Sequence, residues 1–181
     1  MAGIAPSDIL AFWQSAGPDK WFTKDDAFDA ETRSRFLATY EAATAGHLLS
    51  WEARADGALA LTIVLDQFPR NMFRGSARIY WADPLARAVA ERALAGEFDR
   101  SVAPDLRTFF YLPFMHSEAV ADQERCVVLY RALGDASSLR YAEDHADIIR
   151  RFGRFPHRND VLGRATTAEE QAFLDAGGFS G

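Results

Sequence analysis

One apolar run, from Ala58 to Leu65, has Thr62 as its only polar residue. A helix that is apolar on every side has no face for water, so this segment belongs inside a core. A run of this length is also compatible with a buried strand, but the rest of the chain offers no partner strand. The pattern therefore predicts a central core helix.

Polar residues follow this run directly, in the sequence DQFPRN. Pro69 has no backbone N–H and pushes Phe68 away from helical backbone angles, so the run predicts a kinked polar turn. A related sequence, RFPHRN, occupies residues 154–159. The similarity is either a pseudo-repeat or a coincidence. If the two turns pack together in space, they face one cavity.

Apolar residues at helical spacing, bounded by capping residues, predict further helices. Thr167 and Glu170 form a capping box for the last one. No alternating run of β-branched residues appears, and no hairpin dipeptide sits between two apolar strands, so the predicted fold is all-α, a compact array of stacked helical hairpins in a single domain over residues 1–181. The other helices are expected from Ser7 to Ala16, from Ala30 to Ala45, from His47 to Arg54, from Asp83 to Ala95, from Pro104 to Pro113, from Ser117 to Leu133 and from Ser137 or Ser138 to Phe152.

Three expectations concern the placement of particular side chains. Trp21 and Phe22 are expected in a loop that they anchor to the core. His145 falls on the apolar stripe of its helix, where a hydrogen-bonded core histidine is a simpler interpretation than a general base or metal ligand. In the helix that follows Ser117, the residues expected to be buried are Val120, Val127, Val128 and Leu129.

Charge and cysteine content exclude several functional classes. The net charge of -6 argues against binding to nucleic acid or to anionic membranes. Cys126 is the only cysteine, which excludes an internal disulfide and a CxxC motif. No signal-peptide pattern is present, and no apolar stretch approaches the ~20 residues that span a bilayer. We expect a soluble cytoplasmic protein.

Polar residues of the two turns form the candidate binding site. Asp66 ends the most buried helix, and a buried carboxylate requires a partner such as Arg70, Arg74 or an arginine of the second turn. Internal salt bridges and an anion-binding site both explain this set. The candidate ligand-binding residues are Asp66, Arg70, Asn71, Arg154, His157, Arg158 and Asn159.

A second group of polar residues begins at His116 and Glu118. With His145 or His157 they have the side-chain types of a metal site, but acidic residues in a first helical turn also stabilise the helix dipole, which is the simpler interpretation. No metal site is therefore predicted. If the protein is an enzyme, His116, Glu118 and His145 are the candidate catalytic residues. No phosphate-binding loop, dinucleotide fingerprint or nucleophile elbow specifies a cofactor.

Three segments carry a family resemblance. They are LDQFPRNMFRGSARIYW, FFYLPFMHSEAVADQE and HADIIRRFGRFPHRNDVLGR. Together they resemble the uncharacterised bacterial family catalogued as domain of unknown function 924, over almost the whole chain. The resemblance implies an all-helical, tetratricopeptide-like superhelix, and it implies no reaction, cofactor or catalytic residue. Ala146, where the family favours arginine, and the pair Ala119-Val120 depart from the pattern.

Two functions remain open at this point. The first is binding of a small anionic or aromatic ligand in a cavity lined by Arg, His, Asn and carboxylates. The second is a tetratricopeptide-like scaffold that binds a peptide or partner protein. An enclosed cavity with convergent polar groups favours the first, and an open concave face with exposed apolar residues favours the second. No sequence pattern specifies an oligomeric state.

Overall fold

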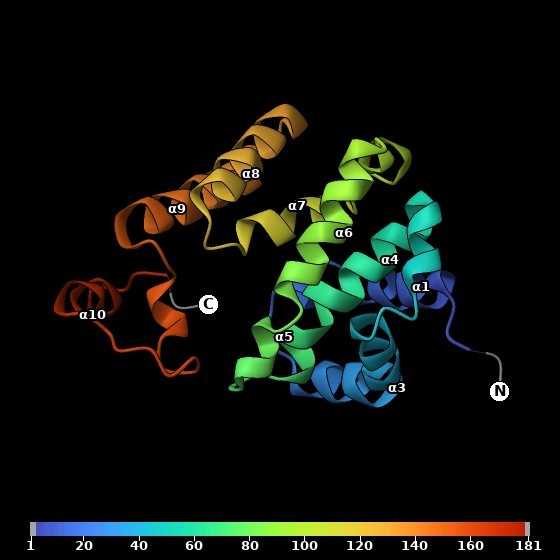
Figure 1. Cartoon of the computed structure of the whole chain (residues 1–181), viewed down its shortest axis with the longest axis horizontal. Coiled ribbons are helices and arrows are strands. Elements are labelled where there is room, and N and C mark those ends of the chain that lie inside the picture. Colours follow the sequence, from blue (N-terminus) through green and yellow to red (C-terminus); the bar gives the residue numbers. More distant parts are fainter. Residues whose placement is uncertain (1–2, 180–181) are drawn as a thin grey trace. The chain divides into compact units, whose positions relative to one another are not determined.

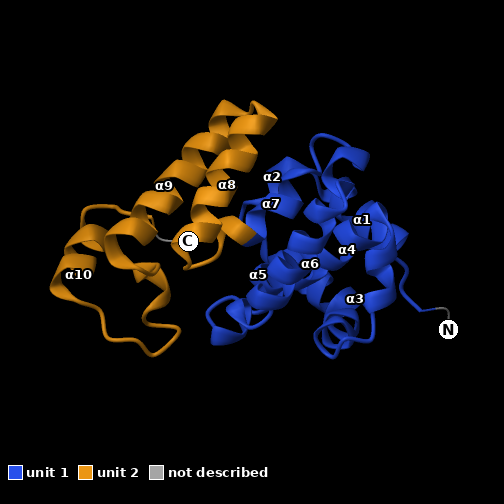
Figure 2. Cartoon of the chain, turned by 45° about the horizontal axis from the view of Figure 1, so that its top comes forward, with its two compact units in different colours: residues 1–113 blue, residues 114–181 orange. Residues whose placement is uncertain are grey.

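The computed structural model of the chain describes residues 3–179. Within these residues the backbone forms helices and turns without any strand, which confirms the all-α prediction (Figure 1). No helix in this part of the chain is long and apolar enough to cross a membrane. The chain divides into two compact units, residues 1–113 (unit 1) and 114–181 (unit 2) (Figure 2). The single domain expected from the sequence stays a prediction.

Unit 1 is built around one buried helix, as the apolar run predicts. Its elements are α1 (Pro6–Ala16), α2 (Pro18–Trp21), α3 (Asp26–Thr44), η1 (Leu49–Ala53), α4 (Ala55–Asp66), α5 (Phe68–Met72), η2 (Ala77–Tyr80), α6 (Asp83–Ala95), η3 (Phe98–Ser101) and most of α7 (Thr108–Met115), where η denotes a 3-10 helix. Helix α4 packs against α1, α3 and α6. Every residue of α4 from Gly57 to its end is buried, because neighbours cover all of its sides.

Aromatic rings fill much of the core of unit 1. The ring of Trp13 lies 5.5 Å from that of Phe109 and 5.8 Å from that of Phe68. Trp21 is buried, and its indole N–H donates to the carbonyl of Trp13 at 2.7 Å. Trp21 therefore anchors its segment, but it lies in α2 and not in a loop. The expected anchor Phe22 is 65% exposed.

The break after the central helix is shorter than predicted. Only Gln67 separates α4 from α5, and Phe68 is the first residue of α5. Pro69 occupies the first turn of α5, where a missing N–H has no intrahelical partner to lose. The predicted displacement of Phe68 from helical geometry is therefore wrong. Another proline, Pro113, lies inside α7, which begins at Thr108 and not at Pro104.

Several helix starts differ from those predicted because other residues make the caps. Helix α3 begins at Asp26, since the carboxylate of Asp25 accepts hydrogen bonds from two first-turn amides, both at 3.0 Å. Helix α1 begins at Pro6, one residue before the expected cap. Asp83 is the first residue of α6 and not its cap, which leaves its carboxylate available to other partners.

Unit 2 contains a helical hairpin followed by a short C-terminal helix. The hairpin consists of α8 (Val120–Leu133) and α9 (Ala136–Phe152), which lie side by side (Figure 1). Gly134 ends α8 with φ at 78°, a left-handed conformation that glycine adopts without strain. Two further elements, η4 (Pro156–Arg158) and α10 (Ala168–Asp175), complete the unit.

The buried face of α8 agrees with the prediction at Val127 and differs at the other three positions. Val120 and Val128 are 42% and 60% exposed, and Leu129 is only half-buried. The buried residues are Gln123, Cys126, Val127 and Tyr130, which recur at helical spacing on a neighbouring face. A buried glutamine explains the difference, because the side-chain amide of Gln123 donates to the carbonyls of Met115 and Ser117 at 2.7 and 2.6 Å.

The caps of unit 2 are partly as predicted. Thr167 and Glu170 form the expected capping box of α10. Asp135, and not Ser137 or Ser138, caps α9 through hydrogen bonds from the amides of both serines, at 3.0 and 3.2 Å. The cap position of α8 is Ala119, whose amide donates to the Ser117 hydroxyl at 3.2 Å, while that hydroxyl donates to the carboxylate of Asp122 at 2.6 Å.

We predict that Gly57→Ala destabilises unit 1. A Cβ atom at this position would lie 2.1 Å from the carbonyl oxygen of Trp51, so the backbone of η1 or α4 must shift. Such overpacking costs about 1–3 kcal/mol in the free energy of unfolding. Urea unfolding measures the loss. Gly3→Ala is the control, because a Cβ there meets nothing within 4 Å; equal stability of the two variants would contradict the prediction.

Candidate functional site

The two turns with the sequences DQFPRN (residues 66–71) and RFPHRN (residues 154–159) are called the first and second FP-containing turns. The first contains a buried carboxylate and the cation that pairs with it. Asp66 is fully buried, and the Arg70 guanidinium lies 3.6 Å from its carboxylate. The same guanidinium donates two hydrogen bonds to Asp83, at 3.0 and 3.2 Å. Burial opposes the charge of Arg70, but the two carboxylates outweigh it and raise its pKa. The structure thus places the predicted partner of Asp66 in its own turn.

Neighbouring polar residues connect the first FP-containing turn to α3 through hydrogen bonds. The amide of Asn71 donates to Asp29 at 2.8 Å, and Arg74 donates to both oxygens of Asp29 at 2.5 and 3.2 Å. Together with Arg70 and Asp83, these bonds link α5 to α3 and α6. The polar groups of this turn thus have partners inside unit 1, which supports the salt-bridge interpretation for Arg70 and Arg74 and gives Asn71 a hydrogen-bonding role.

The second turn has its own buried carboxylate, Glu170. Arg154 donates two hydrogen bonds to it, at 2.6 and 2.8 Å, and Asn159 adds one at 3.2 Å. The backbone amide of Thr167 donates another at 2.8 Å. These donors, above all Arg154, lower the pKa of Glu170 to about 2. Glu170 therefore fastens the second turn to the start of α10.

Glu118 holds the second turn from the other side. It accepts two hydrogen bonds from Arg164, at 2.8 and 3.1 Å, and one from the backbone amide of Phe155 at 2.9 Å. Burial raises the pKa of Glu118, but the bonds from Arg164 and Phe155 outweigh it and lower the pKa. Glu118 is therefore an ionised group with its oxygens engaged, and its catalytic role stays a prediction.

The remaining residues of the second turn lie near rings. The guanidinium of Arg158 lies 4.4 Å from the centre of the Phe155 ring, and only 7% of Arg158 is exposed. Burial, followed by the charge of Arg158, lowers the pKa of His157 to about 4. The two FP-containing turns belong to different units, and the partners given above for each turn lie within its own unit. The hypothesis of one shared site stays a prediction.

The metal alternative finds no support in the described residues. Within residues 3–179, no group of three or more His, Cys, Asp and Glu side chains is arranged to hold a metal ion. His116 is close enough to His145 to lower its pKa electrostatically, and Glu118 is bound to Arg164.

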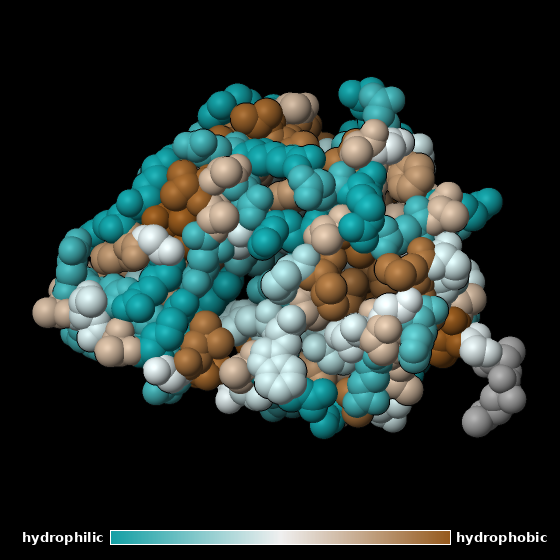
Figure 3. Space-filling model, viewed as in Figure 1, coloured by the Kyte–Doolittle hydropathy of each residue, from teal (hydrophilic) through white to brown (hydrophobic). Residues whose placement is uncertain are grey.

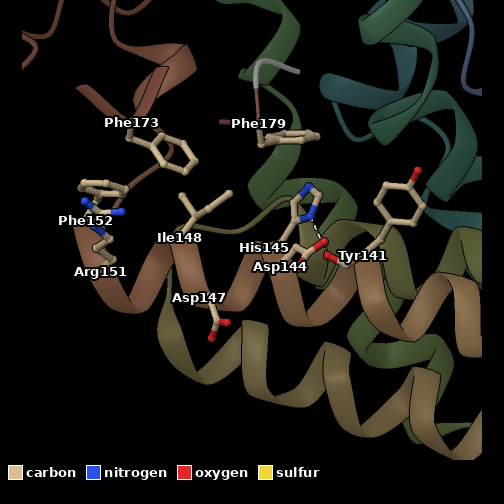
Figure 4. A pocket seen from close by; sticks show the side chains of 9 residues that line it. All are labelled: Tyr141, Asp144, His145, Asp147, Ile148, Arg151, Phe152, Phe173 and Phe179. Carbon is tan, nitrogen blue, oxygen red and sulfur yellow. Dashed lines mark hydrogen bonds between the residues drawn. The ribbon is translucent and has the colours of Figure 1, made fainter. Parts of the chain in front are cut away.

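A pocket of about 450 Å³ lies along one side of α9 in unit 2 (Figure 4). Phe173 reaches it from α10, and Phe179 reaches it from the segment that follows. The sequence indicated Phe152 and Phe173 only as apolar helix positions, and no pattern pointed to Phe179. The lining residues are Tyr141, Asp144, His145, Asp147, Ile148, Arg151, Phe152, Phe173 and Phe179.

His145 is the buried polar group of this pocket. Its Nδ1 lies 2.7 Å from the carbonyl oxygen of Tyr141, which only accepts, so Nδ1 carries the proton. Burial lowers the pKa of His145 to about 4, so the ring is neutral at pH 7. The neutral ring then has a lone pair on Nε2. In residues 3–179, Nε2 has no hydrogen-bond partner.

We predict that stability falls between pH 7 and pH 5 because of His145 and His157. Both have folded pKa values near 4, below the usual 6.5, so the unfolded chain binds protons first as the pH drops. Protonation of each histidine in the unfolded chain therefore lowers the free energy of unfolding by about 1–2 kcal/mol between pH 7 and pH 5. Urea unfolding at both pH values measures this, and His145→Gln/His157→Gln should flatten the dependence. His47→Gln, at an exposed histidine, should leave it unchanged.

A second prediction concerns the buried carboxylate Glu170. Glu170→Gln should lower the free energy of unfolding at pH 7 by about 1–3 kcal/mol, because Arg154 loses its charged partner. The folded pKa of about 2 lies below the usual 4.5, so the parent protein loses this stability as the pH falls through that window. The variant should lose less over the same range. Glu124→Gln, at an exposed position of α8, is the matched control.

Comparison with known proteins identifies the family. The family model described as "Bacterial protein of unknown function (DUF924)" matches residues 9–178. A solved structure, "Structure of Protein of Unknown Function ATU0120 from Agrobacterium tumefaciens", is 50% identical with a TM-score of 0.92, and the match covers 94% of this chain and 97% of that one. No curated protein matches. The chain therefore belongs to the DUF924 family of bacterial proteins of unknown function.

Proposed function

We propose that unit 2 binds a small aromatic ligand that carries a hydrogen-bond donor, in the pocket beside α9. The main support for this proposal is the neutral side chain of His145, which lies among phenylalanine rings. Small-ligand sites are typically concave, mostly apolar and about 300–1,000 Å³ in volume, with few polar groups that fix orientation. The pocket, at about 450 Å³, falls within this range.

The walls of the pocket favour a ring. Phe152 and Phe173 lie with their ring centres 5.2 Å apart and their planes inclined by 55°. At the other end, Phe179 lies 4.4 Å from the His145 ring. A ligand ring between these groups would gain the edge and offset contacts that aromatic pairs prefer, about 0.5–1.5 kcal/mol for each pair beyond its burial.

His145 selects the polar group of the ligand. With the proton on Nδ1 directed at the Tyr141 carbonyl, Nε2 accepts and does not donate. A ligand O–H or N–H, as in a phenol or an indole, is the complementary group. A carboxylate would instead place its lone pairs against that of Nε2. This contrast favours the aromatic over the anionic ligand for this pocket.

The charged rim is balanced and adds no preference for anions. Arg151 lies over the Phe152 ring at 4.5 Å and pairs with Glu169 at 3.0 Å, so its charge is compensated. Asp147 points away from the other lining side chains and pairs with Arg150 at 2.8 Å (Figure 4). Asp144 adds an exposed negative charge. A neutral ligand fits this rim better than an anion.

The scaffold alternative has one observation in its favour. Val120 and Val128 are exposed apolar residues on α8, and hydrophobic patches lie among hydrophilic residues on the face in Figure 3. Scattered apolar side chains are ordinary on a protein surface, whereas a partner site requires a contiguous patch. The scaffold alternative also requires tetratricopeptide-like stacking of helices to create a concave groove, and this stacking is itself only expected from the sequence. Ligand binding is therefore the better supported function.

The test is titration with p-cresol and with toluene, followed by protein-observed NMR. p-Cresol should bind with a dissociation constant on the order of 1 mM or tighter, as expected for a fragment of this size. Toluene has the same ring and methyl group but no O–H, and should bind about tenfold more weakly because Nε2 stays unpaired.

Variants locate the binding. Phe173→Ala should weaken p-cresol binding, and His145→Phe should remove the preference for p-cresol over toluene. Val128→Ala, an exposed position of α8 in the same unit, should change neither. Equal binding of p-cresol to the parent and to both pocket variants would refute the proposal.

A further inference from the structure

Unit 1 places two arginines over one aromatic ring. The guanidinium of Arg78, in η2, lies 4.1 Å from the centre of the Phe73 ring, and that of Arg33, in α3, lies 5.4 Å from it. Each cation is attracted by the ring, but the two positive charges repel one another. Aromatic contact alone therefore leaves a local excess of positive charge in a chain whose net charge is -6.

Neither arginine has a carboxylate partner within residues 3–179. Arg33 donates one hydrogen bond, to the carbonyl of Met72 at 2.9 Å. The Nε of Arg78 is buried without any acceptor in the described structure. The neighbouring carboxylates are bound elsewhere, since Asp29 pairs with Arg74 and Asp83 pairs with Arg70. Neither guanidinium group therefore forms an ion pair within the described residues.

Tyr40 adds a neutral donor to this cluster. Its ring centre lies 5.3 Å from that of Phe73, and only 3% of the residue is exposed. Burial raises the pKa of Tyr40, so its hydroxyl keeps the proton at neutral pH. Within the described residues, this hydroxyl makes no hydrogen bond. A phenol with a proton to donate therefore accompanies the two cations.

Trp81 forms an open aromatic surface beside the same group. The guanidinium of Arg78 lies 5.8 Å from its ring centre, and 67% of Trp81 is exposed. An exposed indole next to an uncompensated cation suits a ligand that joins a planar group to an anion. All five residues of this cluster belong to unit 1.

We propose that the Arg33, Tyr40, Phe73, Arg78 and Trp81 cluster binds the phosphoryl group of an aromatic phosphate monoester. Two guanidinium charges match the charge of a phosphate dianion, whereas a carboxylate balances only one. Arginine forms strong charge-assisted hydrogen bonds to phosphate oxygens, and the Tyr40 hydroxyl supplies another donor. The planar substituent stacks on Trp81. The site is separate from the pocket of unit 2 and does not depend on the function proposed there.

Calorimetric titration of the whole chain with phenyl phosphate and with benzoate, at low ionic strength and in phosphate-free buffer, tests this site. Phenyl phosphate should bind about tenfold more tightly than benzoate. Arg78→Gln and Arg33→Gln should each weaken phenyl phosphate about tenfold or more. Arg140→Gln is the matched control, since Arg140 is an exposed arginine of α9 without a carboxylate partner in the described residues.

Thermal melting of the same variants separates a binding role from a structural one. Without ligand, Arg78→Gln should melt at the parent temperature or above it, because the substitution removes a repulsion. A lower melting temperature, combined with no phenyl phosphate binding by the parent, would show that Arg78 only supports the fold and would overturn the proposal. Unchanged affinity in Arg78→Gln, or benzoate binding as tight as phenyl phosphate, would overturn it equally. Arg78→Lys keeps the charge and should recover part of the affinity.

Discussion

Asp66 has no access to water, and a carboxylate in that position needs a cation and hydrogen-bond donors close by. Helix α4 is buried from Gly57 to its end, so its last residue, Asp66, is buried as well. Arg70, one turn further along the chain, meets both Asp66 and Asp83 and so joins the end of α4 to the start of α6. The position of α5, which carries Arg70, follows from this requirement.

Unit 2 also pairs its carboxylates with arginines, but it uses different residues. Glu118 and Glu170 hold the second FP-containing turn from two sides, through Arg164 and Arg154. An FP sequence after a helix thus serves in each unit as a short stiff segment whose polar side chains reach back to neighbouring helices. The pattern that first indicated a binding site is explained to a large extent by the framework of each unit.

The sequence predicted the features that depend on local chemistry. The apolar run of α4 and the Thr167–Glu170 capping box could be recognised because each needs only neighbouring residues. The buried face of α8 could not be, because it depends on Gln123 reaching carbonyls that precede the helix. Helix α3 begins four residues before the expected Ala30, because the carboxylate of Asp25 accepts hydrogen bonds from the first-turn amides and so extends the helix toward the N-terminus.

The candidate sites were harder to predict because they depend on polar atoms that have no partner within residues 3–179 once the chain has folded. Composition alone suggested many arginines for an anion, but most of those in the two turns have carboxylates within reach. Only coordinates distinguish Arg70, which bridges two carboxylates, from Arg78, whose Nε is buried without an acceptor. Phe179 likewise joins the pocket only after the chain has folded back on α9.

This distinction also indicates where selection for function and selection for stability conflict. A buried donor without an acceptor, or two like charges over one ring, lowers the stability of the folded state and gives no internal contact in return. Asp29 lies four residues before Arg33 and Asp83 five residues after Arg78 in the sequence, yet both carboxylates are bound to other arginines. A framework optimised for stability alone would pair these cations or replace them. Their position beside an exposed Trp81 fits the proposed binding of an anion from outside the chain.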